Sequence, residues 1–116
     1  MVTLYGIANC DTIRKARKWL AAHDVEHRFH DFRKDGLERD RLAGWIDTVG
    51  WEMLLNKRST TWRRLDDADK QEIDAARAIE LLLAHPALIK RPVLEAGNRL
   101  LVGFDEQRYR DALGLA

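Results

Sequence analysis

The pattern of apolar and polar residues in the first third of the chain predicts a strand, a helix and a second strand. Thr3–Ile7 is short and rich in β-branched and aromatic residues, which is typical of a strand. Apolar residues recur at helical spacing from Ile13 to Leu20, between polar and basic positions, as on a surface helix. Val25–Phe32 again has the pattern of a strand. This order favours two parallel strands with a right-handed crossover.

The middle of the chain, about residues 37–85, has no segment with a convincing strand pattern. Apolar positions at helical spacing appear in Leu37–Val49 and more clearly in Ile73–Leu83, so both segments are predicted to be helices. Trp51–Leu55 is compatible with a further short helix, and Asn56–Trp62 has the composition of a polar loop. We therefore expect a helical insertion here.

The last third of the chain returns to a strand pattern. Pro92–Leu94 is predicted to be short and extended, since proline opens a strand where no ladder donor is needed. Gly97 and Asn98 fit a two-residue hairpin loop before a strand over Arg99–Gly103. The continuous apolar run Leu100–Val102 predicts a strand buried on both faces.

A closing helix is predicted after this hairpin. Asp105 is a candidate N-cap, and Gly114 follows the last helical position, Leu113. The predicted order is therefore βαβ, a helical insertion and ββα, an α/β arrangement in one domain of 116 residues. Its parts are the sheet-forming halves 1–36 and 86–116 and the insertion at about 37–85.

Composition and charge narrow the class of protein. Twenty Lys and Arg residues against nineteen Asp and Glu give a formal net charge of +1, which argues against a dedicated nucleic-acid binder. The N-terminus lacks the basic start and apolar run of a secretory signal. No segment approaches the ~20 apolar residues of a membrane span. We expect a soluble cytoplasmic domain without a membrane partner.

The single cysteine, Cys10, excludes an intrachain disulfide and a multi-cysteine metal site. It lies at the predicted turn between the first strand and the first helix, where unpaired backbone N–H groups favour a thiolate. Arg14 and Lys15 add positive charge, whereas Asp11 acts in the opposite sense. A free cysteine is often only a small buried hydrophobe, but this position favours a reactive thiol.

Two other features have simple structural interpretations. Pro92 forces Arg91 out of the helical region, so the residues by themselves indicate a helix-to-strand junction with an exposed arginine. His27 and His30 are spaced by three residues, but in a strand that spacing sends their side chains to opposite faces. We therefore expect no metal site.

Several short motifs, taken in order, resemble those of the arsenate reductase-like family. They are the strand followed by Cys10, the run Leu54–Arg58, the helix before His85-Pro86, and Ile89–Pro92. This family comprises ArsC reductases, Spx regulators and small YffB-type proteins, and the resemblance is closest to the YffB type over essentially the whole chain. It implies a thioredoxin-like fold with a mixed four-stranded sheet and an inserted helical region.

The resemblance also implies roles for individual residues. Cys10 would be the nucleophile, and the bond between Arg91 and Pro92 would be cis and lie beside the cysteine loop. Arg91 would hold an oxyanion or a substrate carboxylate, because a guanidinium pairs with such groups through two N–H donors. By position, Asn9 and Thr12 are candidates to donate hydrogen bonds to the sulfur or the anion.

The chain departs from the family pattern at three places. Ile13 stands where related proteins carry the second cysteine of Cys-x-x-Cys, so an internal thiol cannot resolve a mixed disulfide. Arg58 is the nearest candidate for a second ArsC arginine. The position of the third ArsC arginine falls near Val102, and Arg99 lies close to it in the sequence. We therefore expect an incomplete arsenate-binding set of arginines.

The leading hypothesis is a glutathione-dependent thiol-disulfide reductase in which Cys10 is the nucleophile. An external thiol resolves the mixed disulfide. Glutathione is then a co-substrate, and no tightly bound cofactor is expected. One alternative is an arsenate reductase that uses glutathione and glutaredoxin through an arsenate adduct of Cys10. Others are a non-enzymatic, Spx-like partner of RNA polymerase and a purely structural domain.

Overall fold

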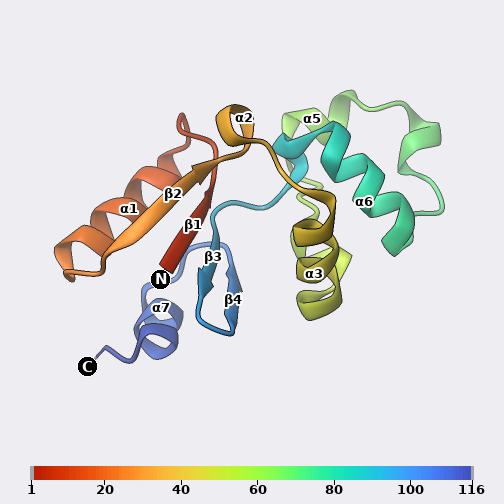
Figure 1. Cartoon of the computed structure of the whole chain (residues 1–116). Helices are drawn as coiled ribbons and strands as arrows, with labels where there is room; N and C mark the ends of the chain where they lie inside the picture. Colours follow the sequence, from red (N-terminus) through yellow and green to blue (C-terminus); the bar gives the residue numbers. More distant parts are fainter. Residues whose placement is uncertain (1, 116) are drawn as a thin grey trace. The chain divides into compact units, whose positions relative to one another are not determined.

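The computed structural model describes residues 2–115. Within them the chain forms two compact units, drawn in Figure 1. The first, here called the sheet unit, comprises residues 2–36 and 91–115. The second, here called the helical unit, comprises residues 37–90.

The sheet unit contains one mixed four-stranded sheet of order β2-β1-β3-β4 (Figure 1). Its strands are β1 (Val2–Gly6), β2 (His27–Asp31), β3 (Val93–Ala96) and β4 (Arg99–Val102). β1 and β2 are parallel, as the βαβ pattern predicts, and β1 pairs antiparallel with β3, which pairs antiparallel with β4. The predicted α/β fold with a mixed four-stranded sheet is confirmed.

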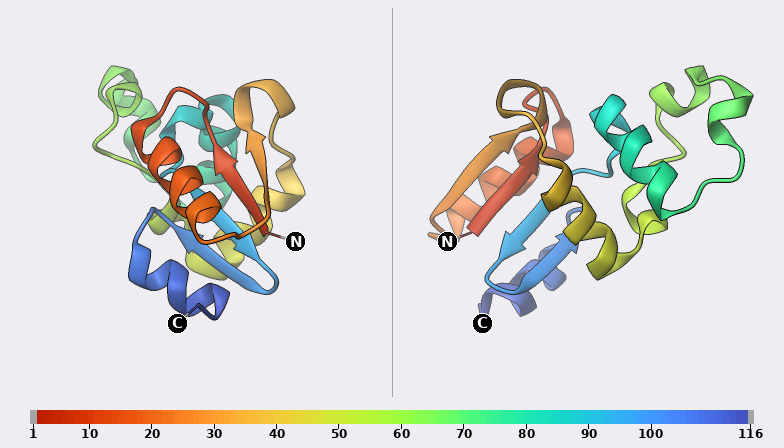
Figure 2. Two further views of the ribbon diagram at one scale, coloured as in Figure 1. Left: turned by 90° about the vertical axis from the view of Figure 1, so that its left-hand side faces the viewer. Right: turned by 45° about the vertical axis from the view of Figure 1, so that its right-hand side comes forward.

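Two helices cover one face of this sheet, α1 (Asp11–Ala22) and α7 (Glu106–Leu113) (Figure 2). Leu4 of β1 and Leu94 of β3 lie opposite each other in the register, and both are fully buried. They form one hydrophobic cluster with residues of the two helices: Ala16, Trp19, Leu20 and Tyr109. Burial of this apolar surface is the main source of the unit's stability.

Close contact between β1 and α1 depends on Gly6. A Cβ atom at this position would lie 2.2 Å from Cδ1 of Ile13, which is itself 1% exposed. The absence of a side chain at Gly6 therefore lets the first turn of α1 approach the end of β1.

Most predicted boundaries in the sheet unit are confirmed. The hairpin loop is Gly97-Asn98. Asp105 caps α7, and its side chain accepts a hydrogen bond from the backbone N–H of Arg108 at 3.1 Å. Gly114 ends the helix with a positive φ of 68°, a conformation that glycine adopts at little cost.

The structure corrects three details of the predicted elements. The apolar run Leu100–Val102 is not buried on both faces, since Leu100 and Leu101 are only half-buried. The reason is that β4 is an edge strand. Strand β3 begins at Val93, one residue after Pro92. The predicted loop Asn56–Trp62 includes the start of a helix, which Ser59 caps by accepting a hydrogen bond from the N–H of Trp62 at 3.1 Å.

The helical unit is built from short elements. They are α3 (Arg39–Val49), α4 (Trp51–Leu54), α5 (Thr60–Arg64), a 3₁₀ turn η1 (Asp67–Lys70), α6 (Ala75–Ala84) and a 3₁₀ turn η2 (Pro86–Leu88). A single antiparallel bridge joins Leu55 to Ile89. Beside it the N–H of Asn56 donates to the carbonyl of Leu88 at 2.8 Å, and that of Lys90 donates to the carbonyl of Leu54 at 2.7 Å. The segment after α4 is thus connected by backbone hydrogen bonds to the C-terminal end of this unit. In the sheet unit, the one-turn helix α2 (Phe32–Asp35) follows β2.

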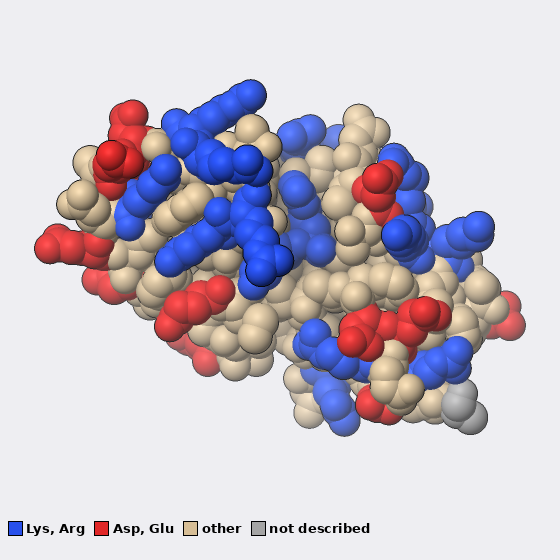
Figure 3. Space-filling view, turned by 180° about the vertical axis from the view of Figure 1, so that it is seen from behind, with Lys and Arg blue, Asp and Glu red and all other residues tan. Residues whose placement is uncertain are grey.

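Surface charge is of both signs. The face drawn in Figure 3 carries both basic and acidic side chains, with several basic ones side by side in the upper left of the view. In the helical unit Arg39 of α3 forms an ion pair with Glu80 of α6. The hydrogen bond from Arg39 and its positive charge lower the pKa of Glu80 below its ordinary value. Among the described residues no helix is both long and apolar enough to cross a membrane.

Candidate thiol site

The strand register places four chain segments at one edge of the sheet. Tyr5 near the end of β1 pairs with Val93 at the start of β3, which also pairs with Val102 at the end of β4. The parallel neighbour β2 ends at the same edge, where Asp31 pairs with Gly6. The loop after β1, the segment before β3 and the turn after β4 therefore begin or end at the same edge.

Cys10 is the N-cap residue of α1. Its backbone is extended, with φ −135° and ψ 126°, and its carbonyl accepts the first helical hydrogen bond from the N–H of Arg14 at 3.0 Å. The residue is half-buried, and its side chain makes no capping hydrogen bond. The sulfur is thus attached at the end of α1 where free N–H groups favour an anion.

Charged neighbours of Cys10 oppose each other. Asp11 and Arg14, which had opposite expected effects on the thiol, form an ion pair on the exposed surface of α1. Their side chains are 84% and 63% exposed, so solvent screens both charges. The two charges beside Cys10 are therefore paired with each other at the surface of α1.

Arg91 and Pro92 lie at the same edge, directly before β3. The bond between them is cis, which confirms the expectation from the family resemblance. Pro92 is buried, and its carbonyl accepts a hydrogen bond from the N–H of Gly103 at 2.8 Å. Arg91 is half-buried, and no described residue hydrogen-bonds or ion-pairs with its guanidinium. Its paired N–H donors are thus available to an anion.

Two further predicted residues flank Cys10. Asn9 is exposed in the loop after β1, and Thr12 is half-buried in the first turn of α1. Both are therefore close to Cys10 along the chain. Their roles as hydrogen-bond donors stay predictions.

Arg58 lies in the helical unit, between α4 and α5. Its backbone belongs to a tight polar turn: its N–H donates to Oδ1 of Asn56 at 3.1 Å, and its carbonyl accepts from Nη2 of Arg63 at 3.2 Å. Asn56 therefore uses its side-chain oxygen to hold this turn. Arg58 itself is exposed, and its part in anion binding stays a prediction.

The structure removes Arg99 from the candidates. Arg99 pairs with Ala96, which pairs with Val2 at the start of β1. It therefore lies at the edge of the sheet opposite the one that carries Cys10 and Arg91. Arg99 is close to Val102 in the sequence, but the two residues lie at opposite ends of β4.

One arginine at the site edge was missed in the sequence. Arg108 in the first turns of α7 donates from Nη1 to the carbonyl of Val102 at 3.2 Å. Its spacing of three residues from the predicted cap Asp105 was visible in the sequence. The position of that cap at the cysteine edge, however, follows only from the register.

The expectation about histidine and metal ligands concerns β2. Nε2 of His30 is 2.7 Å from the carbonyl of Gly36, and Nδ1 of His27 is 3.0 Å from that of Val25. Each ring thus contacts a nearby backbone carbonyl. Within residues 2–115 no cluster of three or more His, Cys, Asp or Glu side chains has a metal-binding arrangement.

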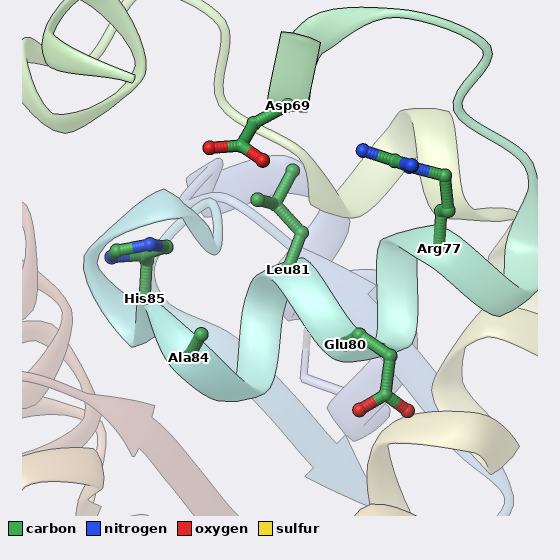
Figure 4. A pocket seen from close by; sticks show the side chains of 6 residues that line it. All are labelled: Asp69, Arg77, Glu80, Leu81, Ala84 and His85. Atoms are coloured by element: carbon green, nitrogen blue, oxygen red, sulfur yellow. The ribbon is translucent and has the colours of Figure 1, made fainter. Parts of the chain in front are cut away.

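The helical unit has a cavity of its own, of about 350 Å³ (Figure 4). Its lining residues are Asp69, Arg77, Glu80, Leu81, Ala84 and His85. Arg77 already donates to the carbonyl of Ala68 at 3.3 Å, and Glu80 pairs with Arg39. None of the residues predicted for the thiol site lines this cavity.

This sheet topology, with a cysteine at the start of the first helix and a cis-proline before β3, defines a thioredoxin-like protein. The chain belongs to the ArsC family, whose model matches residues 5–112.

Individual relatives agree with this assignment. The structure of a YffB protein is 50% identical, with a TM-score of 0.94 over 97% of this chain and 99% of the other. An arsenate reductase (ArsC) related protein from Brucella melitensis is 47% identical, with a TM-score of 0.77 over 98% and 95%. The global transcriptional regulator Spx of Streptococcus pyogenes is 33% identical over 95% of this chain and 83% of its own.

Proposed function

We propose that this protein is a thiol-disulfide reductase in which Cys10 is the nucleophile and glutathione the co-substrate. The observation that carries the proposal is the common edge of the sheet, where the N-cap cysteine of α1 and the half-buried Arg91 both lie. Membership in the ArsC family supports thiol-based reduction as the general chemistry.

The reaction has two exchange steps. The Cys10 thiolate attacks one sulfur of a disulfide, so that a bond from Cys10 to that sulfur forms and the other sulfur leaves as a thiolate. When the sulfur retained on Cys10 belongs to glutathione, a second glutathione thiolate attacks it. Oxidised glutathione leaves, and Cys10 returns as a thiolate. The external thiol is required because Ile13, one helical turn further on, is buried and has no thiol.

The arginines hold the charged ends of the thiol substrate. Arg91 binds a carboxylate of glutathione, and Arg58 is the second candidate for this role. Asn9 and Thr12 donate hydrogen bonds to the sulfur or the anion. A cytoplasmic location agrees with this chemistry, because glutathione keeps thiols reduced there.

The direct test replaces the thiol. Cys10→Ser is expected to abolish the glutathione-dependent reduction of hydroxyethyl disulfide, because a serine hydroxyl forms no disulfide. Intact mass measurement after incubation with oxidised glutathione should show one added glutathione on the wild type and none on the variant. Glutathione-dependent turnover by a folded Cys10→Ser protein would contradict the proposal.

Arsenate reduction is the second candidate, and the ArsC-related relative from Brucella melitensis favours it. Cys10 would displace a hydroxide from arsenate, and two thiols would then supply the electrons that convert arsenate to arsenite and become a disulfide. Arsenate would be the sole oxidant in an assay with glutathione and glutaredoxin. Saturable turnover there would promote this candidate over disulfide reduction.

A non-enzymatic role is the third candidate, favoured by the similarity to Spx. Retention of this protein on immobilised RNA polymerase at physiological salt, together with no reductase activity, would support that role.

A further inference from the structure

The structure places a second arginine at the cysteine edge of the sheet unit. The guanidinium of Arg108 is bound through Nη1 to the carbonyl of Val102, the last residue of β4. The next residue, Gly103, donates its N–H to the carbonyl of Pro92. Arg108 is therefore hydrogen-bonded to the end of β4, and the turn after β4 is hydrogen-bonded to Pro92, the residue that follows Arg91.

Most of the Arg108 guanidinium remains available to a ligand. Only one of its five N–H donors is engaged, at a neutral carbonyl. The residue is exposed, and no ion pair joins it to the carboxylates of residues 2–115. An anion arriving here would therefore meet an unneutralised charge with a defined position.

The sheet order relates the segment after β1, where Cys10 lies, to the end of β4, where Arg108 is hydrogen-bonded. Cys10 follows β1 and Arg108 is tied to β4, and β3 lies between these strands. Two strand spacings correspond to about 9.5 Å. A cavity of about 310 Å³ lies between α1 and the start of α7, lined by Lys15, Lys18, Trp19, Ala22, Phe104 and Glu106. Neither Cys10 nor Arg108 lines this cavity, which lies along α1 from Lys15 to Ala22.

We propose that Arg108 binds the α-carboxylate of the γ-glutamyl group of glutathione while its thiol reacts at Cys10. This inference rests on the proposed function and specifies its substrate recognition. The glycine carboxylate is then left for Arg91, whose strand β3 is adjacent to β1. The γ-glutamyl arm is lengthened by two methylenes compared with a normal peptide link, so its carboxylate reaches the more distant arginine.

Acidic neighbours of Arg108 favour this end of glutathione over the glycine end. Asp105 uses Oδ1 to accept from the backbone N–H of Arg108, and Glu106 lines the neighbouring cavity. A γ-glutamyl group carries an ammonium beside its carboxylate. A turn that carries a guanidinium and two carboxylates, not paired with each other, is therefore complementary to this zwitterion, whereas the glycine carboxylate has no such ammonium.

The test compares glutathione with cysteinylglycine, which keeps the glycine carboxylate but lacks the γ-glutamyl group. Arg108→Gln is expected to raise KM for glutathione roughly tenfold with little change in kcat, as for one lost charge-assisted hydrogen bond. KM for cysteinylglycine should stay unchanged, and Arg108→Lys should recover part of the glutathione affinity. Arg99→Gln removes the same charge at the opposite edge and serves as the matched control, with no expected change for either thiol.

Each result separates this inference from the proposed function. Wild-type turnover with an unchanged glutathione KM in Arg108→Gln would overturn the role of Arg108 but leave the reductase intact. A KM shift in Lys15→Gln without one in Arg108→Gln would assign the carboxylate to the cavity lining instead. A wild type that shows no glutathione turnover would overturn both proposals. Thermal unfolding of each variant checks that the fold is kept.

Discussion

The sheet unit and the helical unit differ in the interactions that stabilise each of them internally. In the sheet unit, β1 and β3 are far apart in the chain but are joined residue by residue in one register, from Val2 opposite Ala96 to Tyr5 opposite Val93. In the helical unit, short helices follow one another, and the single bridge between Leu55 and Ile89 is its only strand-like pairing among the described residues. Precise placement of side chains thus comes from the register of the sheet unit.

This difference bears on the chemistry. Cys10, Arg91 and Arg108 belong to three segments distant in the sequence, and the sheet brings all three to one edge. Arg58 is attached to a polar turn of the helical unit instead. We therefore expect the arginines of the sheet unit to contribute more to substrate binding than Arg58 does.

The largest expected effect tests this ranking directly. Arg91→Gln should lower kcat/KM for glutathione by roughly 10–100-fold, because it removes a charge-assisted hydrogen bond from a half-buried position. Arg58→Gln, the same change in the helical unit, should lower it by less. Steady-state kinetics of both variants with glutathione make the comparison. An equal or larger loss in Arg58→Gln would reverse the ranking.

A glycine substitution is expected to have opposite effects in the two units. Gly6→Ala should destabilise the protein by about 1–3 kcal/mol, because the new Cβ overlaps Cδ1 of the buried Ile13. Gly44→Ala on the exposed surface of α3 has nothing within 4 Å of its Cβ and should stabilise it by roughly 0.5–1 kcal/mol. Urea unfolding measures both free energies.

A double substitution identifies the cause. Ile13→Val removes the Cδ1 atom that the new Cβ meets, so it should cost less in the Gly6→Ala background than in the wild type. Additive losses in the two variants would show that the contact with Ile13 is not responsible.

An effect similar in size to that of Gly44→Ala is expected in the core under α7. The hydroxyl of Tyr109 is buried and has no hydrogen-bond partner among the described residues. Tyr109→Phe should therefore raise the free energy of unfolding by about 1 kcal/mol. A loss of similar size would mean that this hydroxyl is satisfied in solution.

The same variant has a signature at high pH. Burial raises the pKa of Tyr109 above its ordinary value of 10.0. A raised pKa in the folded state means that the neutral phenol stabilises the fold below pH 10 and that this stability is lost as the pH rises. The alkaline decline in stability should be smaller in Tyr109→Phe than in the wild type, by chemical unfolding at pH 8 to 11.

Local sequence patterns predicted much of the fold. The spacing of Ile13, Ala16 and Leu20 identified the buried face of α1, and Gly97-Asn98 identified the hairpin. These features depend on residues close in the chain, so the sequence is enough to find them. The half-burial of Leu100 was missed because an apolar run is the same whether its strand is central or at an edge.

In the candidate site, too, the features that depend on neighbouring residues could be predicted from the sequence, and the others could not. A lone cysteine before a helix was enough to suggest a nucleophile and to require an external thiol, because both conclusions concern one position and its near neighbours. The cis bond before Pro92 was expected only from family resemblance, since base rates for the bond favour trans.

The choice among arginines needed the tertiary structure. Arg99 is closer in sequence to the position expected for an anion-binding arginine, yet Arg108 lies at the cysteine edge and Arg99 at the opposite one. The sequence by itself determined the order of elements and the dependence on Cys10, because local spacing encodes both. Only pairing between distant strands decided which charges share an edge with the thiol, because hydrogen-bond register is a relation between segments and is absent from either segment alone.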